Sequence, residues 1–101
     1  MNTFSLERLG IRNLDFTGEI IGQSAGANPS VKIYRTQGQK YIGQLEANKK
    51  FSQAQNFDKP KDLIDWFSKV QCGINSDTQD AIEDAAKNDK AFEETWNEHV
   101  D

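Results

Sequence analysis

The spacing of apolar residues changes once along this chain, and that change constrains the fold more than any other feature. In the N-terminal half apolar side chains alternate with polar ones, most clearly at Leu14, Phe16 and Ile20. A period of two is typical of a strand with one buried face. After Asp58 the spacing becomes helical. Strands followed by helices predict an α+β domain: an antiparallel sheet of three to five strands with two or three C-terminal helices packed on one face.

A second hairpin is expected where the β-forming segments 31–36 and 41–45 flank a Gln-Gly turn. A two-residue turn sets Tyr34 opposite Tyr41, a favourable cross-strand pair. A three-residue turn with Gly38 in its middle shifts the pairing by one. We favour the first register, which places both tyrosines on one face of the sheet.

The length of 101 residues indicates a single domain, 1–101. We divide it into a β-rich part (1–47), a linker (48–57) and a helical, acidic part (58–101). Charge is divided in a similar way. Residues 1–71 contain ten Lys or Arg and seven Asp or Glu, a net charge of +3. Residues 72–101 contain two Lys or Arg and nine Asp or Glu, a net charge of −7, and the sum is the overall −4. The two parts are therefore expected to have different roles.

Two or three helices are expected in the second part. Asp58 can cap the first, with Pro60 in its opening turn, and the segment 60–71 is predicted to be the main core helix. Asp89 can cap a third helix, although 77–99 could also form one continuous helix. The predicted centre of the core comprises Leu14, Phe16, Ile20, Ile33, Ile42, Leu63, Ile64 and Phe67.

Catalytic and metal chemistry find little support in the sequence. The single Cys72 and single His99 could form a nucleophile and base only if the fold brought them together. One His and one Cys cannot furnish a zinc site. The acids between residues 77 and 84 lack the spacing of a calcium loop and fit an exposed helix start. We therefore predict no enzyme, no catalytic residue, no cofactor and no metal site.

Glycines recur at intervals of four at Gly18, Gly22 and Gly26. A phosphate-binding loop needs glycines that open a helix, and no helix is expected here. Strand flexibility or a strand bulge, followed by a mobile loop, is the interpretation we favour. Whether the loop from Gly22 to Ser30 binds anything is left open.

The second hairpin is the best candidate surface, because exposed aromatic and basic side chains suit binding. The predicted partner-binding residues are Lys32, Tyr34, Arg35, Lys40 and Tyr41. The leading hypothesis is a small non-catalytic interaction or regulatory module that docks onto a protein partner or forms a homodimer. The first alternative is nucleic-acid binding through the same basic-aromatic face. The second is a small-ligand-binding or enzymatic domain.

The setting expected from the sequence is the cytoplasm. No apolar run approaches the roughly 20 residues that cross a bilayer, and the first residues show neither a basic start nor an apolar stretch. A single cysteine excludes an internal disulfide. We therefore expect no membrane contact, and nucleic acid as a less favoured partner than protein.

Overall fold

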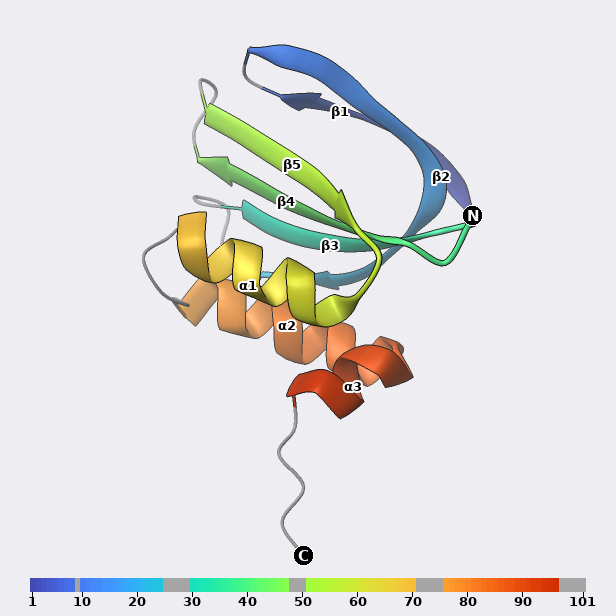
Figure 1. The fold of residues 1–101 in the computed structure, drawn as a ribbon, viewed down its shortest axis with the longest axis vertical. Helices are drawn as coiled ribbons and strands as arrows, with labels where there is room; N and C mark the ends of the chain where they lie inside the picture. The colour runs from blue at the N-terminus through green and yellow to red at the C-terminus, as the bar shows by residue number, and fades with distance from the viewer. Residues whose placement is uncertain (9, 25–29, 48–50, 71–75, 97–101) are drawn as a thin grey trace, which may run out of the picture.

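The computed structural model describes all of the chain except residues 9, 25–29, 48–50, 71–75 and 97–101. Within the described residues, five strands are followed by three helices (Figure 1). The strands are β1 (Asn2–Arg8), β2 (Ile11–Gln23), β3 (Ser30–Thr36), β4 (Tyr41–Ala47) and β5 (Phe51–Phe57). The helices are α1 (Pro60–Val70), α2 (Ser76–Asn88) and α3 (Lys90–Trp96). This order confirms the predicted α+β fold.

The sheet is an antiparallel meander in which every strand pairs with its neighbour in the chain. Its shape is set by β2, which pairs first with β1 and then with β3. Gly18 belongs to both ladders, opposite Asn2 on one side and Thr36 on the other. A Cβ atom at Gly18 would lie 2.4 Å from the Arg35 carbonyl oxygen, so only glycine fits at this bend. Beyond it β1 and the first part of β2 curl back over the rest of the sheet (Figure 1).

A bulge in β2 changes which isoleucine is buried. The pairing with β3 shifts between Ile20 and Gly22, which leaves Ile21 as the extra residue. Ile21 is consequently buried beneath the helices, whereas Ile20 is 41% exposed. The predicted bulge is confirmed, and the prediction that Ile20 lies at the centre of the core is wrong.

The β3–β4 hairpin has the register that we did not favour. Arg35, not Tyr34, lies opposite Tyr41. The turn has three central residues, and Gln39 adopts a positive φ of 65°. Its N–H donates to the Thr36 carbonyl oxygen (3.0 Å), while the Thr36 hydroxyl accepts the N–H of Lys40 (3.0 Å). These bonds stabilise the longer turn, and the shift by one residue moves the two tyrosines to opposite faces.

The segment predicted to be a linker contains a strand. Residues 48–50 lie outside the described residues, but Phe51–Phe57 forms β5, antiparallel to β4 with Phe57 opposite Tyr41. The glutamines of this strand have weak β-propensity, and the polar sequence hid it. An edge strand tolerates such residues because one side of it meets solvent.

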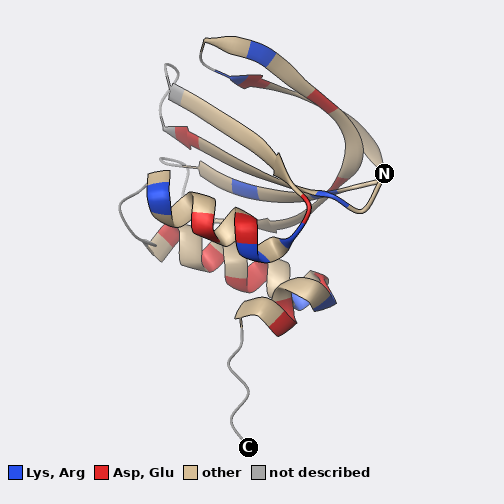
Figure 2. Ribbon diagram, in the orientation of Figure 1, with Lys and Arg blue, Asp and Glu red and all other residues tan. Residues whose placement is uncertain are grey.

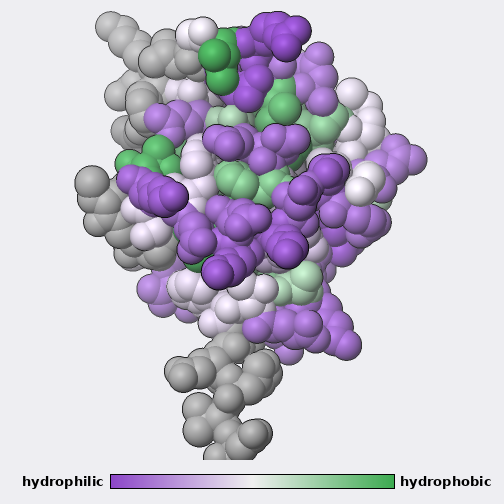
Figure 3. Space-filling model, viewed as in Figure 1, coloured by the Kyte–Doolittle hydropathy of each residue, from purple (hydrophilic) through white to green (hydrophobic). Residues whose placement is uncertain are grey.

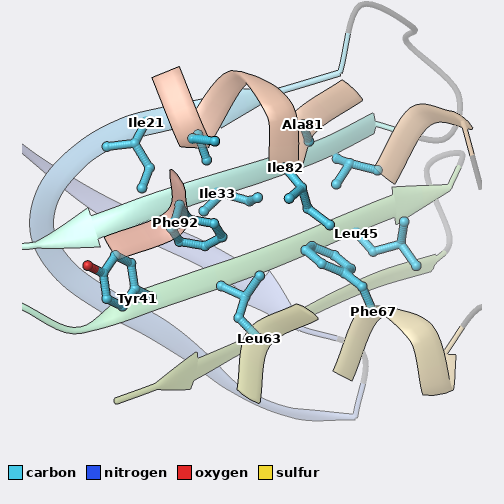
Figure 4. Close-up of a cluster of buried hydrophobic side chains, with 12 residues drawn as sticks. Ile21, Ile33, Tyr41, Leu45, Leu63, Phe67, Ala81, Ile82 and Phe92 are labelled. Atoms are coloured by element: carbon cyan, nitrogen blue, oxygen red, sulfur yellow. The ribbon is translucent and has the colours of Figure 1, made fainter. Parts of the chain in front are cut away.

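Two hydrophobic clusters lie on opposite faces of the sheet. The helix-side core lies between the sheet and the helices (Figure 4) and comprises Ile21, Val31, Ile33, Tyr41, Leu45, Leu63, Phe67, Ala81, Ile82, Ala85, Ala86 and Phe92. The inner core lies inside the curl and comprises Leu6, Tyr34, Ile42 and Ala54, with Phe4, Leu14 and Phe16 partly buried against it. Apart from the exposed Ile20, the predicted core residues are therefore divided between two clusters.

The helices begin and end close to the expected positions. Helix α1 confirms the predicted 60–71 helix to within one residue, and it packs closely on Gly43, where a Cβ would lie 3.1 Å from the Trp66 ring. The chain breaks between α2 and α3 at Asp89, whose carboxylate accepts the N–H of Phe92 (3.1 Å). The alternative of one helix over 77–99 is wrong. None of the helices in the described ranges is long and apolar enough to cross a membrane.

Candidate functional site

The predicted aromatic-basic surface is not formed, because its two tyrosines are buried on opposite faces. Tyr34 is 2% exposed and Tyr41 is 8% exposed. The Tyr34 ring lies in the inner core between Phe4 and Phe16, with ring centroids 4.9 and 5.1 Å away. Its hydroxyl donates to Gln44 Oε1 (2.7 Å), and burial raises the pKa of Tyr34 to about 12, with a smaller contribution from Glu46.

Arg35 and Tyr41 are brought together on the other face by a buried carboxylate. Asp89, with a side chain only 3% exposed, accepts the Tyr41 hydroxyl at 3.1 and 3.2 Å and pairs with Arg35 Nη1 at 3.1 Å. Arg35 Nη2 pairs with Glu19 at 2.5 Å. Burial, and then the charge of Asp89, raise the pKa of Tyr41. Because these contacts join the α2–α3 junction to β2, β3 and β4, the cluster stabilises the fold.

The two predicted lysines lie apart from this cluster. Lys32 is half-buried on the face of β3 that carries Tyr34. Lys40 is exposed and forms an ion pair with Asp58, which lowers the pKa of that carboxyl. The five residues therefore form no continuous surface, and their role in partner binding stays a prediction.

The two residues considered as a catalytic pair, Cys72 and His99, are not among those that the structure describes. Among the residues that the structure describes, no group of three or more His, Cys, Asp or Glu is placed to hold a metal ion.

The most distinctive surface lies where the curled sheet fails to close. β1 and β5 are its edge strands, and in the described part of the chain no backbone ladder joins them. Side chains bridge them instead. The Ser52 hydroxyl donates to the Glu7 carbonyl oxygen (2.7 Å), and Arg8 Nη1 approaches the Ala54 carbonyl oxygen at 3.5 Å. A seam thus remains between the two edges.

Two adjoining hollows line this seam and the side of α1, and we call them together the seam groove. The first, of about 390 Å³, is lined by residues that include Arg8, Ile11, Ser52, Gln55, Trp66 and Val70. The second, of about 290 Å³, is lined by Gln55, Phe57, Asp62, Asp65, Trp66 and Lys69. Because Gln55 and Trp66 line both, the hollows lie next to one another along β5 and α1.

Arg8 is held in place at the first hollow. Its Nε donates to the Arg12 carbonyl oxygen at 2.8 Å, across the β1–β2 turn. Together with the contact to Ala54, this orients the guanidinium through two backbone carbonyls. Within the described residues no carboxylate lies within ion-pair distance of it. Arg8 is therefore a fixed cation that forms no ion pair with any acid of the described residues.

Apolar surface accompanies this cation. Ile11 is 62% exposed. Trp66 is half-buried, and its ring packs against Phe57 and Phe67 with centroids 5.7 and 5.1 Å away. Packing on both sides fixes the indole while one part of it stays accessible. Figure 3, which faces α1 and β5, shows green hydrophobic patches among hydrophilic side chains.

Charge is unevenly distributed along the seam groove. Figure 2 shows both basic and acidic residues on the β1–β2 hairpin and on α1, so the difference lies in which of them line the groove. Arg8 lines the first hollow, whereas Asp62 and Asp65 line the second together with Lys69. The groove thus has a basic end and a more acidic end, with Trp66 between them.

Comparison with known proteins adds no identification: no family model, no curated protein and no solved structure matches this chain.

Sequence reasoning missed the seam groove. A signal was present at Trp66, a large aromatic residue that stands beside the Leu63–Phe67 stripe rather than within it. Ile11 directly follows a glycine turn, where an apolar side chain has little cover. Without the recognition of β5, however, the second wall of the groove could not be placed.

Proposed function

We propose that this protein is a non-catalytic interaction module that binds a protein partner through the seam groove. The observation that supports it best is the grouping of an exposed isoleucine, a fixed tryptophan and an arginine without an acidic partner among the described residues, at Ile11, Trp66 and Arg8. Trp and Arg are the residues that most often dominate the free energy of protein–protein binding. The glutamine and serine side chains around them supply the polar rim of such an interface.

The nucleic-acid alternative lost its main support when the two tyrosines proved to be buried. A stacking surface needs accessible rings beside cations. The rim of the seam groove carries Asp62 and Asp65, whose charge opposes a phosphate backbone. The protein-binding hypothesis is therefore favoured. The single cysteine of the chain fits a cytoplasmic setting for it.

The test is site-specific photocrosslinking in the cells that naturally contain the protein. A benzophenone amino acid replaces the exposed Gln55, which lines both hollows. We expect a discrete crosslinked protein that disappears when Ile11→Asp places a carboxylate beside Arg8. Ile20→Asp is the matched control, because Ile20 is also an exposed isoleucine of β2 and does not line the groove. Crosslinking that survives Ile11→Asp unchanged would contradict the proposal.

A further inference from the structure

The seam groove also indicates what kind of segment it binds. Resting on the proposed function, we infer that the partner contributes an extended peptide segment with a carboxylate side chain at the Arg8 end and a cationic side chain at the Asp62–Asp65 end. An apolar side chain between them contacts Trp66. The carboxylate follows from the state of Arg8, the cationic side chain from Asp62 and Asp65, and the extended shape from the length of the groove.

The carboxylate is required by the state of Arg8. Two backbone carbonyls already orient its guanidinium, so little conformational freedom is lost when it binds a ligand. The planar fork of arginine matches a carboxylate with two parallel hydrogen bonds. Arg8 has no acidic partner within the described residues, and an incoming carboxylate neutralises it.

The acidic end of the groove favours a cationic side chain of the partner. Asp62 and Asp65 line the hollow on the far side of Trp66. A dianionic phosphate at Arg8 would be repelled by these carboxylates more strongly than a monoanion. A lysine or arginine of the partner is instead attracted to them, although Lys69 in the same hollow weakens that attraction.

The extended shape follows from the length of the groove. Along α1 it runs from Asp62 to Val70, which spans about 12 Å at the helical rise of about 1.5 Å per residue. An extended chain covers that span with about four residues. Two hollows in a row suit alternate side chains of such a segment better than they suit one compact molecule. Trp66 lies between them, where an apolar residue of the segment meets it.

A second copy of this chain is a poorer occupant. A two-fold dimer through the seam groove would set a concave surface against the same concave surface. Neither could fill the other without leaving voids, and well-packed interfaces are close to the packing density of protein interiors. A protruding segment of another protein fits the hollows directly.

The experiment uses the full chain and a phage-displayed library of random eight-residue peptides. We expect the enriched peptides to carry an acid and a base about four residues apart, with an apolar residue between them. A synthetic peptide from this set should bind Arg8→Gln about tenfold more weakly than the unchanged protein. Arg8→Lys, which keeps the charge and loses the fork, should fall in between. Arg12→Gln, the matched control on the same hairpin, should bind normally.

The acidic end is tested with the double variant Asp62→Asn and Asp65→Asn. This variant should bind the peptide several-fold more weakly than the unchanged protein does. The two proteins should bind equally well a peptide in which alanine replaces the base. The inference is overturned if enriched peptides lack acids, if no peptide is enriched, if Arg8→Gln binds normally, or if the free protein is a dimer through this face. Peptides that contact Trp66 without regard to charge would overturn only the inference and leave the proposed function standing. Peptides that bind elsewhere would count against both.

Discussion

At the scale of single residues, Asp89 has several structural roles at once. It is 5% exposed, it caps α3 through the N–H of Phe92, it accepts the Tyr41 hydroxyl, and it pairs with Arg35. A buried carboxylate is tolerated only when its oxygens are satisfied in this way. The position of one side chain therefore determines how α3 turns away from α2 and how both helices are joined to the sheet.

Removing this carboxylate should destabilise the protein strongly. We expect Asp89→Ala to lower the free energy of unfolding by about 3 kcal/mol, because it removes a helix cap, the carboxylate partner of Tyr41 and one of the two acidic partners of Arg35. Asp89→Asn, which keeps a capping oxygen, should cost less than half as much. Urea titrations followed by circular dichroism measure both changes. A loss below about 1 kcal/mol for the alanine variant would show that the cluster is not stabilising.

At the scale of elements, the docking of helices depends on where the strands lack a side chain. A Cβ atom at Gly22 would lie 2.3 Å from the Ala81 carbonyl oxygen and 2.7 Å from the Ala85 backbone nitrogen. Helix α2 thus lies directly against the backbone of β2. Rigid backbone atoms cannot move aside as a flexible side chain could, so the close approach requires glycine.

Gly22→Ala should therefore separate α2 from β2. We expect a loss of about 3 kcal/mol or more in the free energy of unfolding, at or above the upper end of what overpacking usually costs. The control is Gly38→Ala in the β3–β4 turn, where the nearest atom to a new Cβ is 3.9 Å away. Chemical denaturation of both variants checks this, and equal stability of the two would refute the close-approach argument.

The elements themselves were largely predictable from the sequence, but one register was not. Leu63 and Phe67 at helical spacing located α1, and the cap at Asp89 located α3. The β3–β4 register escaped prediction because these strands are buried on both faces, with Ile33 on one and Tyr34 on the other. A shift of the register by one residue then exchanges one apolar face for another, so the pattern of apolar residues does not reveal the register. The turn alone determines it.

The seam groove could not be predicted from the sequence, for a related reason. It is formed by parts of the chain that are far apart, the β1–β2 turn near Arg8, the strand β5, and α1 around Trp66. They meet only because β2 bends at Gly18, and the extent of that bend depends on contacts across the sheet rather than on local propensity.

At the scale of the whole molecule, one sheet separates two cores. The helix-side core contains the contacts with α1, α2 and α3, whereas the inner core is formed by strands only. Since β3 and β4 contribute to both, neither core can open without disturbing residues that the other depends on. We therefore expect the protein to unfold as one cooperative unit.

Alkaline titration of Tyr34 tests this cooperativity. Its pKa is raised to about 12 in the folded protein, against about 10 in an unfolded chain. The neutral phenol is thus favoured by folding, so its contribution to stability is complete below pH 10 and is lost as the pH rises from 10 to 12. Although Tyr34 lies in the inner core, the loss should appear in the fluorescence of Trp66 and Trp96, which lie in the helices.

Urea midpoints across this pH range, followed by tryptophan fluorescence, provide the measurement. Tyr34→Phe should show a shallower decline, and the difference between the two curves isolates the Tyr34 phenol, because it is the only ionisable group in which the two proteins differ. Identical curves would mean that the inner core and the helices unfold independently.

The meander order of the strands also bears on how the protein is made. Each strand pairs with the one synthesised just before it. Each hairpin can therefore form as soon as its second strand has left the ribosome. The sheet can be complete once Phe57 has emerged, and its helix-side face then stays uncovered until α1 and α2 follow. During that interval Ile33 and Leu45 are exposed to solvent, and translation speed through the last third of the chain governs how long the nascent protein is prone to aggregate.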